Sequence, residues 1–386
     1  MADMYIISLF AAAINNTAPK LPPDDVDWRK LYMFADKNGI AGTLYYSIIK
    51  LPKECRPDKA VFDLFEKSMR IALGIESIQH FEISALMDSL EFHKIEYMPL
   101  KGWLMKNYYP YPNMRTMCDV DILVNQADMG KIPKILAECG FEFEEHGANH
   151  DGYIKSGRIA TEIHWGLFSE DSDYYDYFKD ILQRAENVDG REYQRRMSLE
   201  DFYLHMIAHL AKHFEHSGTG IRSFADIYLY NKAVGNKLDK DYINAGLAGL
   251  GLSRFAAVVE KASFCWFSEN EEPDDECEMI ADYILYSGTY GRKDIGIASG
   301  IGERKGSRGK YLLRRFFPRR SYLIPEFPIL EKYPAFVPAC WVVRGIKCAL
   351  FKRGRISYEV KMVRNMDNES MNAIGSIKKM CGLDKR

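Results

Sequence analysis

The 386-residue sequence lacks the cysteine patterns that hold a metal or form a redox pair. It contains no Cys-x-x-Cys pair, and no cysteine stands in a zinc-like cluster with histidine. The eight cysteines are scattered along the chain, at positions 55, 118, 139, 265, 277, 340, 348 and 381. We therefore expect reduced thiols in a cytoplasmic protein.

We expect no secretion signal at the start of this sequence, which also has no long apolar run and no excess of charge of one sign. Tyr5 to Ile14 is mostly apolar, but it is too short to span a bilayer, and Asp3 rather than a basic residue precedes it. The formal net charge of −2 gives no overall attraction to nucleic acid or to membranes. With 47% hydrophobic and 27% charged residues, the composition is that of an ordinary soluble globular protein.

The sequence divides into four regions that differ in residue pattern and composition. Residues 1–93 predict an N-terminal helical region, with a long helix over 58–93 and Asp24 or Asp25 as the cap of an earlier one. Residues 94–168 alternate strand-like and helix-like runs, as an α/β unit does. Residues 169–303 predict a helical domain that ends in a glycine-rich loop, 291–302. Residues 304–386 form a basic, aromatic C-terminal region, with a helix over 339–363 and a frayed end.

Two aspartates lie one residue apart in the strand-like run from Met114 to Val124. Alternate side chains of a strand share a face, so Asp119 and Asp121 point the same way. Parallel carboxylates repel each other unless a cation lies between them. Mg²⁺ suits this position because it takes oxygen ligands and leaves positions open for phosphate. The alternative is that the strand ends here and both aspartates are solvated or capped.

Other charged residues in the chain could complete such a site. Lys101-Gly102 stands at a strand-to-helix turn that could meet an anion, or it is an ordinary helix start with a solvated lysine. Glu162 supplies a third carboxylate on another strand, where His164 shares its face; alternatively Glu162 is exposed and His164 is a satisfied, partly buried imidazole.

A cationic stripe is predicted on one later helix, at His205, His209, Lys212 and His213. The stripe lacks the glutamate of a zinc protease motif and suits an anion better than a metal. Arg222 and Asp226 are spaced to pair with each other and support the cationic stripe, or they form an ordinary surface ion pair.

Residues 304–320 hold eight Lys or Arg side chains interleaved with aromatic ones. Such a run is usually a solvated face. Single-stranded nucleic acid or an anionic membrane surface are the alternatives. Because the net charge is near zero, we do not expect nucleic-acid binding. Peripheral membrane contact through residues 304–320 is the less expected alternative to a solvated face.

Several of these motifs together resemble the uncharacterised nucleotidyltransferase family, a branch of the polymerase-β-like nucleotidyltransferase superfamily. The resemblance covers roughly residues 5–350. It rests on Leu100-Lys101-Gly102, Tyr109-Pro110-x-Pro112, Arg115, Asp119 to Val124, Gly140-Phe141, Glu162-Ile163-His164, Leu199-Glu200-Asp201, His209 to His213, Ile221-Arg222-x-x-x-Asp226 and Leu313 to Pro318.

The resemblance implies an α+β fold, in which a nucleotidyltransferase-like mixed β-sheet core is flanked by N-terminal and C-terminal helical parts. It implies that Asp119, Asp121 and Glu162 are the catalytic residues and metal ligands. Lys101 and Gly102 would face the triphosphate, and Arg115, Lys212 and Arg222 would complete the nucleotide site. The superfamily usually has Gly-Gly or Gly-Ser at the phosphate turn, whereas Trp103 follows Gly102 here.

The implied activity is a Mg²⁺-dependent (or Mn²⁺-dependent) transfer of a nucleoside monophosphate from an NTP. The acceptor would be a hydroxyl or phosphate group of a small molecule, glycan or peptide. The alternative is a catalytically weak or inactive nucleotide-binding regulator of the same fold.

Overall fold

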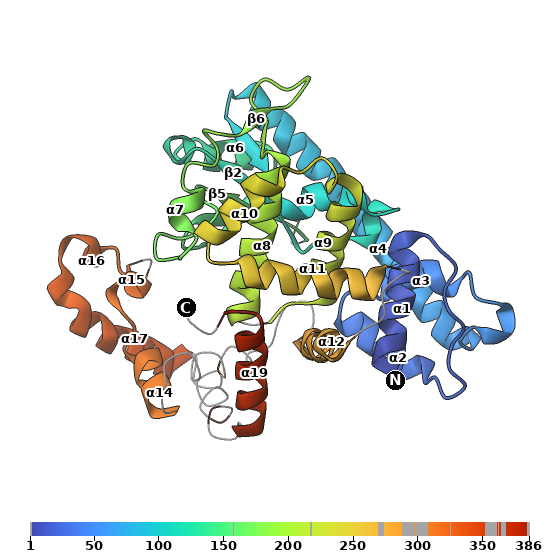
Figure 1. Cartoon of the computed structure of the whole chain (residues 1–386). Coiled ribbons are helices and arrows are strands. Elements are labelled where there is room, and N and C mark those ends of the chain that lie inside the picture. The colour runs from blue at the N-terminus through green and yellow to red at the C-terminus, as the bar shows by residue number, and fades with distance from the viewer. Residues whose placement is uncertain are drawn as a thin grey trace. The chain divides into compact units, whose positions relative to one another are not determined.

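The computed structural model describes residues 2–156, 158–216, 218–268, 274–287, 297, 308–324, 326–351, 361, 363 and 368–383. The chain forms two compact units, one of residues 1–211 with 219–289 and one of 212–218 with 290–386 (Figure 1). Helices flank a mixed sheet, so the predicted α+β class is confirmed. The division of the sequence into four regions stays a prediction.

The first unit opens with four helices: α1 (Ala2–Asn15), α2 (Trp28–Lys37), α3 (Ala41–Ile48) and α4 (Lys59–Phe92). The long helix predicted over 58–93 is confirmed as α4, and Asp58 caps it by accepting from the Val61 N–H at 3.0 Å. The predicted cap of α2 was wrong. Asp27 accepts from the Lys30 N–H at 3.0 Å, because a cap must directly precede the first helical residue.

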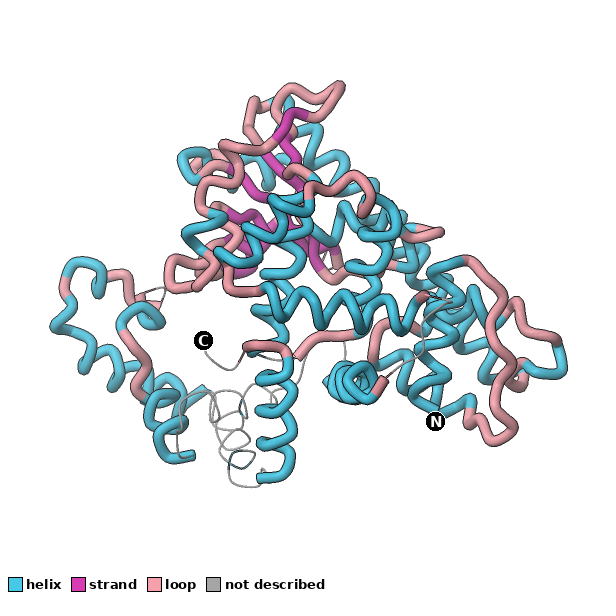
Figure 2. The backbone as a smooth tube through the Cα atoms, in the orientation of Figure 1, coloured by secondary structure: helices cyan, strands magenta, loops and turns pink. Residues whose placement is uncertain are grey.

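Five strands form one sheet: β1 (Tyr97–Pro99), β2 (Asp119–Val124), β3 (Glu142–His146), β4 (His150–Lys155) and β5 (Ile159–His164), in the order β1-β2-β5-β4-β3 (Figure 2, magenta). Strands β2 and β5 are parallel, and all other pairs are antiparallel. The two strands that carry the predicted carboxylates are therefore direct neighbours.

One face of this sheet is buried against helices. Val120, Ile122 and Val124 of β2 belong to a core that also contains Leu86 of α4 and Ile135 of α6 (Ile132–Glu138). Burying such side chains stabilises the fold by about 1.5–3 kcal/mol each. Alternation then directs Asp119 and Asp121 to the opposite face, and a slip of one residue would bury both.

The rest of the first unit is mainly helical. Ser198 precedes α8 and accepts from the Asp201 N–H at 3.0 Å. The remaining elements are η1 (Lys53–Cys55), α5 (Lys101–Met105), η2 (Lys106–Tyr108), η3 (Pro112–Met114), η4 (Gln126–Asp128), α7 (Tyr175–Phe178), β6 (Glu186–Asn187), β7 (Arg195–Arg196), α8 (Leu199–His216), α9 (Ile221–Val234), α10 (Lys240–Gly249), α11 (Ser253–Phe267) and α12 (Asp275–Ser287).

The second unit contains α14 (Arg308–Phe316), α15 (Arg320–Leu323), α16 (Ile329–Lys332), η5 (Pro334–Phe336), α17 (Val337–Phe351) and α19 (Asn368–Met380). The predicted glycine-rich loop and much of the end of the 339–363 helix lie outside the described residues. The expectation of a frayed C-terminus was wrong, because Ile377 is buried and Lys378 donates to the Glu215 carbonyl at 2.7 Å. Within the described ranges, no helix combines the length and apolarity needed to cross a membrane.

Candidate active site

The three predicted carboxylates share one face of the sheet. In the parallel register of β2 and β5, Asp121 lies directly opposite Glu162. Paired residues on neighbouring strands point to the same side, and Asp119 follows two positions earlier on that side. The register therefore places the Asp-x-Asp pair and Glu162 together, opposite the apolar core.

His164 lies between two of these carboxylates. Its Nε2 is 3.3 Å from Asp121 Oδ1 and 3.2 Å from Glu162 Oε2. Burial acts to lower the pKa of His164, but the hydrogen bonds to Asp121 and Glu162 outweigh burial and raise it to about 9. At neutral pH the imidazolium therefore offsets part of the negative charge of this face.

Asp119 is the carboxyl group of the Asp-x-Asp pair whose pKa is raised. Desolvation, followed by the negative charges of Asp121 and Glu162, raises the pKa of Asp119 to about 6. Burial acts to raise the pKa of Asp121 as well, but the hydrogen bond and charge of His164 lower it overall. A divalent cation would relieve this repulsion, and carboxylate oxygens are donors that such cations prefer. The residues present therefore fit the implied metal.

Sequence reasoning missed one residue of this cluster, His150. It starts β4, and its partner across the antiparallel pair is His164. Among the described residues, one group has ligand atoms that all lie within 4.8 Å of one another: His150, Glu162 and His164. No local pattern marks His150, since only the pairing of β4 with β5 brings it to the site.

A buried ionic network lies beside the carboxylates. Asp226 of α9 is fully buried and accepts from Arg115 Nε at 2.8 Å, Arg115 Nη2 at 2.9 Å and Tyr109 Oη at 2.9 Å. Lys101 Nζ is 3.8 Å from Asp226 Oδ2. Burial lowers the pKa of Lys101 to about 8; Asp226 opposes this shift and Arg115 adds to it.

The same network holds the segment that leads into β2. Arg222 of α9 donates through Nη1 to the Thr116 carbonyl at 2.6 Å, three residues before Asp119. The Leu100 N–H donates to the Asp121 carbonyl at 2.9 Å, which ties Lys101 to the strand. Helix α9 thus braces both the lysine and the Asp-x-Asp strand.

Trp103 does not lie on the carboxylate face. Its side chain is part of the core that contains Ile122, and its ring stacks on His80 with centroids 5.5 Å apart. Gly102 packs closely, because an added Cβ would lie 2.7 Å from the Met117 sulfur. The departure from the usual phosphate turn therefore places the indole in the core and leaves the carboxylate face clear of it.

The predicted cationic stripe lies on α8. His205 is buried, with its ring 6.1 Å from that of Phe168 and 5.9 Å from that of Phe178. Lys212 is half-buried and belongs to the second unit. Its contact with phosphate stays a prediction.

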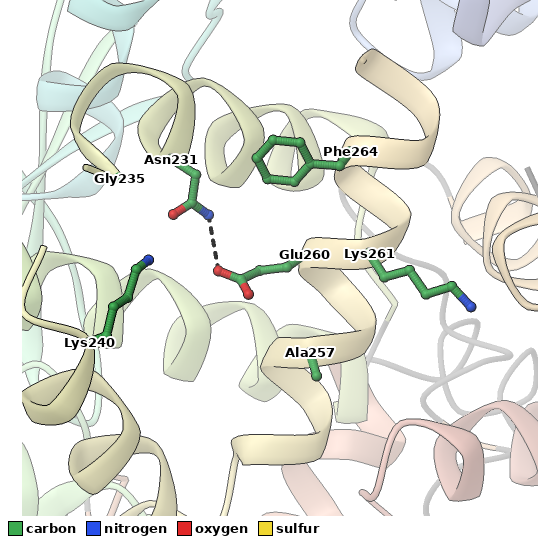
Figure 3. Close-up of a pocket in the computed structure, with 7 residues that line it drawn as sticks. All are labelled: Asn231, Gly235, Lys240, Ala257, Glu260, Lys261 and Phe264. Atoms are coloured by element: carbon green, nitrogen blue, oxygen red, sulfur yellow. Dashed lines mark hydrogen bonds between the residues drawn. The ribbon is translucent and has the colours of Figure 1, made fainter. Parts of the chain in front are cut away.

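A separate pocket of about 610 Å³ lies beside helices α9, α10 and α11 (Figure 3). Glu260 stands in it and accepts from Tyr203 Oη at 2.7 Å and from Asn231 Nδ2 at 3.2 Å. The residues around it are Asn231, Gly235, Lys240, Ala257, Glu260, Lys261 and Phe264. None of them is a predicted site residue, so this pocket is distinct from the carboxylate face.

Comparison with known proteins identifies the family. The model of the uncharacterised nucleotidyltransferase family matches residues 24–267. The chain belongs to this family. As a member of the uncharacterised nucleotidyltransferases, it is a transferase that moves a nucleotidyl group from an NTP to an acceptor. The predicted resemblance is thereby confirmed.

Other comparisons add little beyond the family. No curated protein matches the chain. Among solved structures, the chain is similar to the solution structure of the antibiotic-resistance factor ANT(2'')-Ia. The identity is 13%, the match covers 47% of this chain and 96% of that one, and the TM-score is 0.35.

Proposed function

We propose that this protein transfers a nucleoside monophosphate from an NTP to a hydroxyl or phosphate group of a small molecule, glycan or peptide. The transfer would depend on Mg²⁺ or Mn²⁺ held by Asp119, Asp121 and Glu162. The observation that supports this proposal is the register that sets Asp121 opposite Glu162, with Asp119 on the same face.

In the proposed reaction, an acceptor oxygen attacks the α-phosphorus of the NTP. The bond from that phosphorus to the bridging oxygen breaks, and pyrophosphate leaves. When bound, the cation would neutralise phosphate charge and favour an ionised acceptor. Glu162 completes the ligand set or receives the acceptor's proton. Either role needs a carboxylate directly beside the Asp-x-Asp pair.

The ionic network supplies positive charge for the triphosphate. Lys101 directly follows Leu100, whose N–H donates to the Asp121 carbonyl of β2, and we assign Lys101 the contact with phosphate. Arg115 and Arg222 complete the nucleotide site by adding positive potential and by holding the segment before β2. Gly102 keeps the turn close to that segment, and Lys212 is the further candidate for phosphate contact.

Labelled NTPs test the proposal directly. The full chain is incubated with each α-³²P-NTP, Mg²⁺ or Mn²⁺, and a lysate fractionated into small molecules, glycans and peptides. We expect label to enter one fraction. Asp121→Asn should reduce transfer by roughly 100-fold or more, since a bound metal contributes several kcal/mol and each 1.36 kcal/mol is a factor of ten.

The control is Asp128→Asn, which makes the same chemical change at a residue that pairs only locally with Lys131 at 2.6 Å. It should transfer at the wild-type rate. Wild-type transfer by Asp121→Asn would end the metal assignment. Nucleotide binding in calorimetry without any turnover, and with little dependence on Mg²⁺, would instead identify an inactive nucleotide-binding regulator.

A further inference from the structure

We propose that His150 is a metal ligand, which together with His164 and Glu162 makes the site bind a divalent first-row transition cation in preference to Mg²⁺. The inference rests on the proposed function, which places a cation at the carboxylates. It goes further by assigning nitrogen donors and a class of metal.

Strand pairing brings the three side chains to one place. His150 of β4 lies opposite His164 of β5, and Glu162 lies two residues before His164 on the same face. Antiparallel partners point to the same side of a sheet, so His150 joins the carboxylate face. The ligands thus come from two strands of the rigid sheet, with Asp121 on a third.

The donor atoms converge on a single carboxylate oxygen. His150 Nε2 lies 3.5 Å from Glu162 Oε2, and His164 Nε2 lies 3.2 Å from the same oxygen. The two imidazole rings are 4.9 Å apart between centroids. A cation bound by all three would replace these direct contacts and displace the proton that His164 carries at neutral pH. Its bonds to the ligands would be about 2.0–2.2 Å long, shorter than the present contacts.

A glycine makes room for the His150 ring. An added Cβ at Gly147 would lie 2.3–2.6 Å from three atoms of that ring. Any other residue at 147 would therefore push the imidazole away from its present position. The φ angle of Gly147 is not in the left-handed region, so this close approach, and not backbone conformation, accounts for a glycine here.

The turn that carries His150 is anchored to the end of β5. Asn149 Nδ2 donates to the Gly166 carbonyl at 2.5 Å, and the Trp165 N–H donates to the Asn149 carbonyl at 3.2 Å. The Gly147 N–H also donates to the His150 carbonyl at 2.8 Å. These bonds hold the His150 backbone beside His164 before any metal binds, which lowers the cost of assembling the ligands.

The donor set decides the class of metal. Imidazole nitrogen suits divalent first-row cations such as Fe²⁺, Ni²⁺ and Zn²⁺ best, and Mn²⁺, the weakest binder of that series, also accepts it, whereas Mg²⁺ prefers oxygen donors and keeps its waters. Two imidazoles and a carboxylate therefore favour a transition cation, while Asp119 and Asp121 remain available as oxygen donors.

Metal titration of the chelator-treated full chain, without nucleotide, tests the proposal. Mn²⁺ binding is followed by electron paramagnetic resonance, and Mg²⁺ binding by calorimetry. We expect the wild type to bind Mn²⁺ more tightly than Mg²⁺. His150→Ala should weaken Mn²⁺ binding at least about tenfold, since even supporting residues of metal sites cost 10–100-fold in affinity. Its Mg²⁺ affinity should change little.

His146→Ala is the matched control. His146 lies at the end of β3 near the same turn, is mostly exposed and pairs with Asp151 at 2.7 Å. It should bind Mn²⁺ as the wild type does. Unchanged Mn²⁺ affinity in His150→Ala, or an equal loss in His146→Ala, would overturn the proposal. If His150→Ala does not fold, His150→Phe replaces it, because its ring occupies the same space without a ligating nitrogen. Unchanged Mn²⁺ affinity in that variant would likewise overturn the proposal.

Failure of this inference is distinguishable from failure of the proposed function. Nucleotidyl transfer with Mg²⁺ alongside Mn²⁺ binding that ignores His150 would refute the inference and keep the function. Mn²⁺ binding that depends on His150, without turnover of any NTP, would support the inference and refute the proposed function.

Discussion

Asp226→Asn is the most informative test of how the site is supported. The substitution keeps the shape of the side chain and removes its charge. Asp226 has no exposed surface. It accepts hydrogen bonds from Arg115 and Tyr109, and Lys101 Nζ lies 3.8 Å away. An amide in its place turns an NH₂ group toward at least one donor and leaves buried cations without their carboxylate.

The expected loss of stability follows from that burial. Removing one partner of a buried ion pair costs about 3–5 kcal/mol, because the remaining charge cannot return to water. Two cations share this carboxylate, so we expect a value in that range. Tyr109→Phe removes a single hydrogen bond to a charged group and should cost about 1.5–3 kcal/mol.

Urea unfolding measures both losses. Trp341 is the tryptophan of the second unit, whereas Trp28, Trp103, Trp165 and Trp266 belong to the first. In a Trp341→Phe background, tryptophan fluorescence therefore reports the first unit, and the two units need not unfold together.

The matched control is Asp201→Asn. Asp201 is also buried and also pairs with an arginine and a tyrosine, at 3.1 Å from Arg184 Nε and 3.1 Å from Tyr242 Oη, but it lies outside the network. It should lose stability and keep NTP affinity, whereas Asp226→Asn should lose both. A loss below about 1 kcal/mol in Asp226→Asn, the scale of an exposed pair, would refute the buried-charge reasoning.

Three further predictions concern the nucleotide side of the site. Lys101→Met should weaken NTP binding measured by calorimetry. Lys106→Met, which leaves Glu76 and the Trp103 ring without their cation, should lower stability and keep NTP affinity. Because the pKa of Lys101 is lowered to about 8, NTP affinity of the wild type should fall as pH rises through that value, and Lys101→Met should remove this dependence. A pH profile unchanged in Lys101→Met would contradict the assignment. Trp103→Ala should cost about 3–5 kcal/mol as a core deletion and leave NTP affinity intact in the folded protein; lost affinity would place the indole in the site.

Local sequence patterns were enough to predict α4 and β2. The apolar spacing after Asp58 predicts α4, and the alternation from Asp119 to Val124 predicts a strand with both aspartates on one face. Both predictions succeed because they depend on contacts within a few residues, where the helical and strand periods act directly. The predictions for the cap of α2 and for the C-terminal residues were wrong. Asp27 caps α2 in place of Asp24 or Asp25, and a tertiary contact of Lys378 holds α19.

Which residues meet at the site could be seen only in the tertiary structure. The sequence by itself determined the Asp-x-Asp strand, the Lys101-Gly102 turn and the presence of Glu162, because those motifs are local. Only the pairing of β4 with β5 brings His150 to Glu162, and only the packing of α9 brings Asp226 to Arg115 and Lys101. Nothing in the spacing of these residues fixes such distances, since strand register and helix packing arise from the whole core. The tertiary structure therefore decided which charges meet, and with them the electrostatics of the carboxylate face.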